Sequence, residues 1–478
     1  MKWDLGPDNY RERFKIEPAK IGEITAGRWI AFTFAATKIS MVLLIYNIFI
    51  RLYSIGVRVA SLWNPKAKQW IAGRKNLFEE LGKKIDGNDK IIWFHCASAG
   101  EFEQGKPLIE EVKKHYPAHK ILVSFFSPSG FNAAGKYQNA DIITYLPVDS
   151  PKNAKRFVEL IKPQLAIFVK YEYWYHHLSA LAFRHIPILM ASAIFRRNQL
   201  FFKPYGQFYK QILFLFRKIF VQDEYSLQLL KEHNLTNCSL SGDTRFDRVK
   251  KIADQFAEIP LLKEFTGANN TIVAGSTWND DEEILASYVK GNPVKLIIAP
   301  HEIKNNHILH LQSLFPDCIR YSELTSILDQ GQLQKTSVWS SISQQQEKDI
   351  LQKLMNAKTL IIDCMGLLSR LYHYATVTYV GGGFKTGIHN TLEAVVYGKA
   401  VVFGPKYQKF KEARDLIKDG AAFSVTNFEQ LKTKMDHLLN DPLQLLQAGN
   451  AAKKYVDENL GATQKIVEFI QENRLLTN

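Results

Sequence analysis

The feature that most constrains the fold is a repeated alternation of short apolar runs with helix-like stretches. Apolar runs of four or five residues, separated by helical segments such as 106–115 and 151–161, are typical of buried strands in a parallel sheet. One series comprises 91–94, 121–125, 142–146, 165–169, 186–190 and 218–221, and a second comprises 271–274, 295–299, 359–363, 376–380 and 400–403. We therefore predict an α/β chain with two Rossmann-like domains, each a doubly wound parallel sheet.

The size of the chain supports two domains. At 478 residues it exceeds the length over which one hydrophobic core keeps growing, and a hydrophobic content of 46% can fill two cores. We predict an N-terminal extension and anchor helix over 1–64, a Rossmann-like domain over 65–250, a polar linker over 251–268 and a second Rossmann-like domain with C-terminal helices over 269–478. Ligands of open parallel sheets bind beyond the carboxyl ends of the strands, so we expect the chemistry in a cleft between facing domains.

The N-terminal part of the chain is strongly basic and contains a long apolar segment. Residues 1–84 hold 15 Lys and Arg against 7 Asp and Glu, which favours an acidic partner such as nucleic acid, an anionic membrane or a phosphorylated substrate. Within this part, 39–63 is apolar but is interrupted by Asn47, Arg51 and Arg58. These interruptions favour a helix that lies in the membrane interface, with Tyr46, Tyr53 and Trp63 at the boundary.

Two other interpretations of the apolar segment stay open: a short tilted span that ends near Arg51, and a buried core helix. No secretory cleavage pattern follows the segment, so we expect a retained anchor with the rest of the chain in the cytoplasm. Residues 1–38 suggest no role.

Cysteine and histidine spacing gives no indication of a metal. Four cysteines lie far apart without a CxxC pair, which suits a reducing compartment. The cluster of His301, Glu302, His307 and His310 misses the HExxH spacing, so we interpret these residues as belonging to a surface helix. We expect no metal and no cofactor.

The run GGGFKTGIHNTLEA over 381–394 predicts a strand, a glycine turn and a helix start, which is an arrangement that binds phosphate. The spacing fits neither GxGxxG with a later acidic residue nor a P-loop, so a sugar nucleotide fits better. Glu393 is placed to accept hydrogen bonds from ribose hydroxyls. The alternative is a glycine-rich loop that binds nothing.

Other polar loops follow predicted strands at the same sheet edges. The first strand leads into HCASAGE over 95–101, where Glu101 is placed as a catalytic base; alternatively it is a first-turn helix residue favoured by the dipole. We also predict substrate contacts for residues in this loop, in the next loop and after the fourth strand, namely Ser98, Gly100, Ser127 and Glu172. In the second half we predict that backbone amides and hydroxyls hold donor phosphates at Gly275, Ser276, Pro300 and His301.

The stretch 196–218 combines six basic and seven aromatic residues with no acid. Such a stretch suits an acidic amphiphile at a membrane surface, and we assign Arg196 and Arg197 to substrate binding. A solvated helix face is the alternative, whereas RNA binding is less convincing because no RRM or KH signature accompanies the stretch.

Several longer motifs give the chain a broad resemblance to the 3-deoxy-D-manno-oct-2-ulosonic acid (Kdo) transferases of lipopolysaccharide biosynthesis. They are HCASAGE (95–101), VKYEYW (169–174), SGDTRFDRV (241–249), GSTWNDDEE (275–283), APHE (299–302) and GIHNTLEAVVYGKAVVFGP (387–405). The resemblance runs from the basic anchor to about residue 455.

The resemblance implies a two-domain GT-B glycosyltransferase that is metal-independent and inverting, with CMP-Kdo as donor and the phosphorylated, acylated lipid A precursor as acceptor. It implies a location on the cytoplasmic face of the bacterial inner membrane and no nucleic-acid partner. At matching positions it implies that Glu101 is the catalytic base and Glu172 a functional acid. It also implies that the nucleotide site includes His389, Asn390 and Glu393, to which we add Gly382, Gly383 and Gly387 from the glycine turn.

The chain departs from the family pattern at three points. Lys170 stands where an acid is usual, Tyr175 replaces a proline, and His301 directly follows Pro300 without the usual basic residue. The rival hypotheses are another GT-B transferase or epimerase that uses a UDP-sugar, and a non-catalytic protein that binds anionic lipid.

Overall fold

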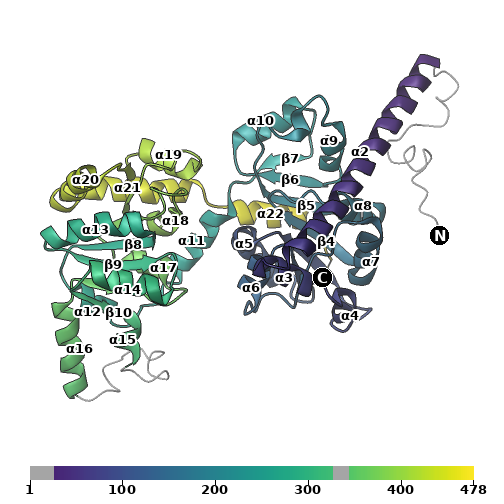
Figure 1. Ribbon diagram of the computed structural model, residues 1–478. Coiled ribbons are helices and arrows are strands. Elements are labelled where there is room, and N and C mark those ends of the chain that lie inside the picture. The colour runs from purple at the N-terminus through teal and green to yellow at the C-terminus, as the bar shows by residue number, and fades with distance from the viewer. Residues whose placement is uncertain (1–25, 327–343, 478) are drawn as a thin grey trace. The chain divides into compact units, whose positions relative to one another are not determined.

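The structure is a computed structural model in which residues 26–326 and 344–477 are described. The chain forms two compact units, and Figure 1 labels their elements. The N-terminal unit contains the chain up to Phe102, Lys113–Leu240 and the residues from Asn473, and the C-terminal unit contains Glu103–Val112 and Ser241–Glu472.

The N-terminal unit is built on a seven-stranded parallel sheet of order β3-β2-β1-β4-β5-β6-β7. Its strands are β1 (Ile91–Cys96), β2 (Lys120–Phe125), β3 (Ile142–Tyr145), β4 (Pro163–Val169), β5 (Ile188–Ala193), β6 (Lys218–Val221) and β7 (Cys238–Leu240). Its helices are α2 (Ala26–Ala60), α3 (Pro65–Ala72), α4 (Leu77–Gly82), α6 (Pro128–Ala134), α7 (Pro151–Ile161), α8 (Tyr175–Phe183), η2 (Leu200–Phe202), α9 (Gln207–Leu213) and α10 (Glu224–Glu232). Helix α5 (Ala99–His115) begins and ends in this unit, but its middle, Glu103–Val112, belongs to the C-terminal unit.

The C-terminal unit has a second seven-stranded parallel sheet, of order β10-β11-β9-β8-β12-β13-β14. Its strands are β8 (Thr271–Thr277), β9 (Lys295–Pro300), β10 (Cys318–Arg320), β11 (Thr359–Ile361), β12 (Val377–Val380), β13 (Ala400–Phe403) and β14 (Ala422–Ser424). Its helices are α11 (Thr244–Asp254), α12 (Leu262–Thr266), α13 (Asn279–Gly291), α14 (Asn305–Leu314), α15 (Tyr321–Ser326), α16 (Gln344–Asn356), α17 (Leu368–Leu371), η4 (Tyr372–Tyr374), α18 (Leu392–Val395), α19 (Lys411–Lys418), α20 (Phe428–Asn440), α21 (Pro442–Glu458) and α22 (Ala462–Glu472).

The expected architecture of two doubly wound parallel sheets is confirmed. All eleven predicted strands are present, with ends that differ by a few residues; β5, for example, begins at Ile188 rather than 186. Three strands were missed, namely β7, β10 and β14, and each has only three residues and lies at an edge of its sheet.

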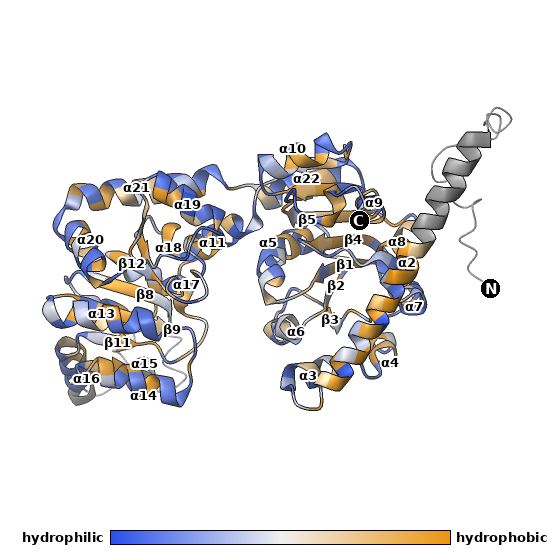
Figure 2. Ribbon diagram, turned by 45° about the horizontal axis from the view of Figure 1, so that its top comes forward, coloured by the Kyte–Doolittle hydropathy of each residue, from blue (hydrophilic) through white to orange (hydrophobic). Residues whose placement is uncertain are grey.

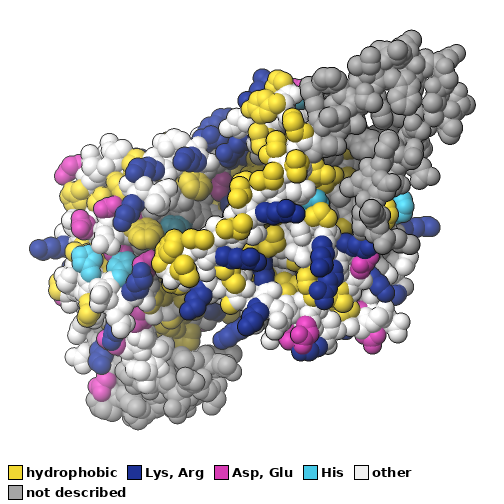
Figure 3. Space-filling model, turned by 45° about the vertical axis from the view of Figure 1, so that its right-hand side comes forward, with side chains coloured by type: hydrophobic (Ala, Val, Ile, Leu, Met, Phe, Trp, Pro, Cys, Tyr) yellow, Lys and Arg dark blue, Asp and Glu magenta, His cyan; other side chains and the backbone are white. Residues whose placement is uncertain are grey.

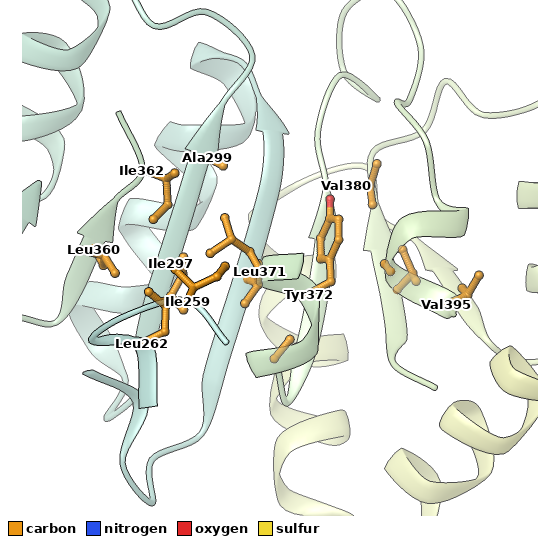
Figure 4. Packing of buried hydrophobic residues seen from close by; sticks show 14 of the residues in the cluster. Ile259, Leu262, Ile297, Ala299, Leu360, Ile362, Leu371, Tyr372, Val380 and Val395 are labelled. Atoms are coloured by element: carbon orange, nitrogen blue, oxygen red, sulfur yellow. The ribbon is translucent and has the colours of Figure 1, made fainter. Parts of the chain in front are cut away.

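Both faces of the C-terminal sheet are covered by core. Alternate residues of β9 belong to different hydrophobic clusters: Ile297 and Ala299 to one, Leu296 and Ile298 to the other. Figure 4 shows the first of these clusters, in which Ile297 lies with Leu262 of α12. Figure 2 shows the strands as predominantly hydrophobic ribbons between mixed helices. Because both faces are buried, the strands read as continuous apolar runs in the sequence.

The expected linker 251–268 is a folded part of the C-terminal unit. The unit begins at Ser241, ahead of that segment. Ile259, Leu262 and Phe265 are 3%, 0% and 1% exposed and belong to the core cluster beneath the sheet. Although the segment is polar overall, these apolar residues attach it to the domain.

Helix α2 lies along the N-terminal unit, and the side chains of Met41–Ala60 can be described. Its inner side packs on the unit: Val42 and Leu43 contact the core, and Ile50 is 6% exposed. The other side exposes apolar residues at helical spacing, among them Leu44, Ile48, Phe49, Leu52 and Ile55. Met41–Ala60 is the one stretch in the described residues long and apolar enough to cross a bilayer.

Candidate functional site

Each sheet has one point at which the strand order reverses, and this is where ligands bind in open α/β sheets. In the N-terminal unit the reversal lies between β1 and β4, which are followed by the loops of Glu101 and Glu172. In the C-terminal unit it lies between β8 and β12, which are followed by Ser276 and by the glycine run from Gly381. Strand order therefore selects the same loops that the sequence motifs indicate.

Glu101 occupies the first turn of α5, directly after β1. It is partly buried, and the Ser98 hydroxyl donates a hydrogen bond to its Oε2. The neighbouring loop is attached to this one, because the backbone N–H of Ser127 donates to Ala97 O at 2.7 Å. A side chain at Gly130 would lie 2.9 Å from the Ser98 carbonyl carbon, so this glycine allows α6 to approach the loop.

Glu172 is held more firmly than Glu101. It is 9% exposed, and its Oε2 accepts a 2.6 Å hydrogen bond from Trp174 Nε1 and lies 3.2 Å from His95 Nε2. The other ring nitrogen of His95 lies 2.9 Å from Ser124 Oγ, which fixes the imidazole within the sheet edge. This network orients one carboxylate oxygen through two aromatic residues.

The two carboxylates lie around one buried thiol. The pKa of Cys96 is raised, first by burial and then by the negative charges of Glu101 and Glu172. The thiol is therefore protonated at neutral pH and is no nucleophile. The remaining predicted substrate residues are more exposed: Gly100 lies at the surface, and Ser127 caps α6 through the N–H of Ser129 at 3.2 Å.

Arg196 and Arg197 follow β5 and are exposed. Arg197 makes a surface ion pair of 3.2 Å with Glu232 of α10, and the side chains are 74% and 41% exposed. The structure therefore does not bring these arginines into the hydrogen-bonded cluster formed by Ser98, Glu101 and their neighbours.

In the C-terminal unit the glycine run permits close approach between loops. A side chain at Gly381 would lie 2.4 Å from Ser276 O, and one at Gly383 would lie 2.6 Å from the backbone of Gly404. Gly382 and Gly387 have φ of +91° and +121°, which other residues rarely adopt. Gly275 leaves room for the buried Tyr372 hydroxyl. These glycines therefore have structural reasons to be present, independent of any ligand.

His301 and His389 meet in a stack of aromatic rings. The His301 ring lies 4.7 Å from Trp278 and 4.5 Å from His389, with interplanar angles of 27° and 25°. Trp278 Nε1 donates to His389 Nε2 at 3.2 Å. Burial, followed by the nearby His301, lowers the pKa of His389 to about 4. At neutral pH the His389 ring is therefore uncharged, and Nε2 acts as an acceptor.

Asn390 and Glu393 form a paired unit at the start of α18. Asn390 Nδ2 donates to Glu393 Oε1 at 3.0 Å, and Asn390 Oδ1 accepts from Leu392 N at 3.1 Å. Burial raises the pKa of Glu393. Helix α18 has only four residues, so its dipole is small. Within the described part of the chain, the backbone N–H groups of Asn390 and Thr391 donate to no protein acceptor. Asn390 is half-buried, whereas Thr391 is 0% exposed, so only the N–H of Asn390 is a candidate to meet an anion.

Three residues near this loop were missed by sequence reasoning. Asp281 is 1% exposed and accepts hydrogen bonds from Gly382 N, Trp278 N and Tyr379 OH at 2.8, 3.0 and 2.8 Å. Trp278 is the outer ring of the stack, and the Thr391 hydroxyl is buried without a partner. An aspartate inside the acidic run 280–283 looked like an ordinary first-turn residue, so only the fold could distinguish it.

Two of the histidines that resemble a metal site have other partners, and the prediction of a surface helix is wrong for His301, which lies in the ring stack ahead of α14. His307 Nε2 lies 2.9 Å from Glu282 Oε2, and Glu282 is fully buried. Glu282 also accepts from the Thr277 hydroxyl at 2.9 Å. These contacts attach α14 to the end of β8, and among the described residues no group of three metal-ligating side chains is present.

Comparison with known proteins identifies one group of similar sequences. Residues 74–248 match the family model described as 3-deoxy-D-manno-octulosonic-acid transferase (kdotransferase). The chain is 26% identical over 389 residues to the 3-deoxy-D-manno-octulosonic acid transferase of Rickettsia felis, covering 80% of this chain and 78% of that one. It is 28% identical over 358 residues to the enzyme of the same name from Aquifex aeolicus, covering 73% and 86%.

Among solved structures, UDP-GlcNAc 2-epimerase from Neisseria meningitidis aligns with a TM-score of 0.54 and 16% identity, over 80% of this chain and 100% of that one. At this identity the match supports the fold alone. Together with two seven-stranded parallel sheets, it indicates the GT-B architecture. The sequence matches and the fold agree: the chain is similar over most of its length to the Kdo transferases and is an enzyme of that glycosyltransferase type.

Proposed function

We propose that the protein transfers Kdo from CMP-Kdo to the lipid A precursor, lipid IVA, by a metal-independent inverting reaction. The observation that carries the proposal is the position of Glu101 and Glu172 at the switch point of the N-terminal sheet, around the buried Cys96. A solvent-accessible carboxylate beside a fixed, buried one is the arrangement that proton removal and acceptor orientation require.

In the proposed reaction Glu101 accepts the proton of an acceptor sugar hydroxyl. The hydroxyl oxygen forms a bond to the anomeric carbon of Kdo, and the bond from that carbon to the CMP phosphate oxygen breaks. The electron pair leaves with CMP, and the proton remains on Glu101. Ser98, whose hydroxyl donates to Glu101, orients the carboxylate before transfer.

The C-terminal unit would bind the nucleotide. The backbone N–H of Asn390 would donate to the phosphate, and Glu393 would accept from ribose hydroxyls. Because α18 is short, we assign phosphate stabilisation mainly to this hydrogen bond rather than to a helix dipole. His389, which is uncharged at neutral pH, would place its ring beside the glycine run.

The acceptor is an amphiphile, so the proposal includes attachment to the cytoplasmic face of the inner membrane. The outer side of α2 supplies exposed apolar side chains, and Arg51, Arg58, Lys66 and Lys68 supply positive charge at the same end of the unit. Figure 3 shows hydrophobic and basic side chains intermingled on this surface. A helix whose inner side packs along the unit suits the interface better than a span.

The test is Glu101→Ala in the full-length enzyme, assayed with CMP-Kdo and a tetraacylated disaccharide acceptor. We expect transfer to fall by about 10²–10⁴-fold, because a general base contributes that much. Protection of the protein by CMP against thermal unfolding should remain. Retained turnover would contradict the assignment of the base, and protection by UDP but not CMP would contradict the donor.

A further inference from the structure

We infer that the inner side of α2 positions the Glu172 loop, in addition to any role of the helix at a membrane. This inference rests on the proposed function, because it concerns how Glu172 is held for the acceptor. The structure shows two separate lines of contact from α2, and both end on residues 172–177. A helix that served only as an anchor would need apolar contacts with the unit and nothing more.

The first line of contact passes through a tilted and a stacked pair of aromatic rings. Tyr53 of α2 lies 6.0 Å from Phe126, between ring centroids, at 35°. Phe126 in turn stacks on Trp174 at 4.7 Å and 27°. Trp174 Nε1 then donates the 2.6 Å hydrogen bond to Glu172. Three aromatic residues therefore connect the helix to the carboxylate.

Phe126 is also held by Arg74 and by Trp70 of α3. The Arg74 guanidinium donates to Phe126 O at 2.8 Å and lies 3.8 Å from the centre of the Trp70 ring. Trp70, on α3, also contacts both Tyr53 and Phe126, at 6.1 and 5.7 Å. The Phe126 ring therefore contacts three aromatic rings, those of Tyr53, Trp70 and Trp174, and Tyr53 is the one that α2 contributes.

The second line is polar and reaches the start of α8. Tyr46 OH donates to Asp149 Oδ2 at 2.5 Å, and Asn47 Oδ1 lies 2.6 Å from His176 Nε2. Asp149 is 2% exposed and also accepts from the backbone N–H groups of His176 and His177. These are the residues that follow Trp174 and Tyr175, so α2 fixes the Glu172 loop at its far end too.

The side of α2 used here is opposite to the side available to lipid. Tyr46 and Asn47 are partly buried, whereas Phe49 and Leu52 are each 61% exposed. Tyr53 is 39% exposed, so its removal leaves no closed cavity. The two roles can therefore be separated by single substitutions on one helix.

The experiment compares Tyr53→Ala with Phe49→Ala, which removes an aromatic ring from the outer side of the same helix. Full-length protein is assayed in detergent micelles with CMP-Kdo and the disaccharide acceptor, and flotation with phosphatidylglycerol vesicles measures membrane binding. For Tyr53→Ala we expect kcat to fall about tenfold, with an unchanged KM for CMP-Kdo and near wild-type flotation. Phe49→Ala should keep its kcat and float less, and Tyr53→Phe should restore kcat.

A wild-type kcat for Tyr53→Ala in micelles would overturn the inference. Two further variants serve if Tyr53→Ala fails to fold. Tyr53→Leu removes the aromatic ring but keeps an apolar side chain, and Trp174→Phe removes the hydrogen bond to Glu172. Both variants should lower kcat. Glu172→Gln distinguishes failure of the proposed role of Glu172 from failure of the proposed positioning role of α2. If it retains full turnover, the proposed role of Glu172 is wrong; if it loses turnover while the Tyr53 variants do not, only the positioning role fails.

Discussion

At the scale of single residues, an uncharged histidine holds the aromatic stack of the C-terminal unit together. His389 Nε2 accepts from the Trp278 indole, and protonation of that nitrogen would replace the hydrogen bond with two facing donors. Burial and the neighbouring His301 oppose the charge as well, which lowers the pKa of His389 to about 4. The stack is therefore a pH-sensitive part of the proposed nucleotide site.

This difference in pKa predicts a pH dependence of stability. The unfolded chain binds a proton on His389 near pH 6.5 and the folded chain only near pH 4, so the contribution of His389 is complete above 6.5 and is lost as pH falls toward 4. Because the ring is only partly buried, we expect a loss of about 1–2 kcal/mol rather than the full linkage value.

His389→Gln keeps an acceptor for Trp278 but cannot titrate in this range. Denaturant unfolding from about pH 7.5 to about pH 4 should show the difference in unfolding free energy between wild type and variant decreasing only below about pH 6.5. Constancy of the difference above that pH is the internal control. A difference that does not change down to pH 4 would contradict the lowered pKa.

The sequence contained much of the site but not its internal support. Glu101, Glu172, Asn390 and Glu393 could be selected because carboxylates and amides after buried strands are recognisable. Asp281 could not, because its role depends on three donors from segments up to 101 residues away. The ring stack likewise joins residues of three separate loops, which no local pattern reveals.

At the scale of elements, the loops after β12 and β13 are in direct backbone contact through a pair of glycines. A side chain at Gly383 would lie 2.6 Å from both Cα and N of Gly404, and Lys406 N donates to Gly383 O at 2.9 Å. Gly383→Ala must therefore separate the loops, and we expect it to cost about 1–3 kcal/mol of stability. It should also weaken the protection that CMP gives against thermal unfolding.

Gly291→Ala provides the matched control. Gly291 ends α13, and a side chain there would meet nothing within 4 Å, so the substitution should be neutral or should stabilise by up to about 1 kcal/mol. Thermal unfolding of both variants, with and without CMP, makes the comparison. Equal stability of the two variants would show that the loops tolerate separation.

Strands were predictable from the sequence where they pair with a neighbour on each edge and are buried on both faces of the sheet. Central strands such as β1 and β8 are buried almost throughout and were predicted from their first residue, although they continue two and three residues beyond the predicted ends. The missed strands β7, β10 and β14 pair on one side only and have three residues, which is too short to show a period. Helix α7 matched at both ends because Ser150 caps it, Pro151 opens it and Lys162 ends it in a left-handed conformation.

At the scale of the whole molecule, one side of α2 contacts the N-terminal unit and the other side is exposed. One side donates to Asp149 and packs on aromatic rings of the N-terminal unit, and the other exposes leucine, isoleucine and phenylalanine. An ordinary surface helix keeps its outer side polar, whereas the outer side of α2 is apolar and its inner side combines polar contacts with buried apolar residues such as Ile50. The sequence alone predicted an interfacial helix, but it could not show that Tyr46 and Asn47 face the protein rather than lipid headgroups.

This arrangement predicts a specific loss of membrane binding. Leu44 and Leu52 are 58% and 61% exposed on the outer side of α2, whereas Leu443 and Leu446 of α21 are exposed to a similar extent, 63% and 59%. If each α2 leucine contributes about 1 kcal/mol by partial insertion, Leu44→Ser with Leu52→Ser should weaken binding to phosphatidylglycerol vesicles about thirtyfold. Leu443→Ser with Leu446→Ser removes comparable apolar surface and should leave binding unchanged. Equal effects of the two pairs would mean that apolar surface in general, rather than α2, contacts the membrane.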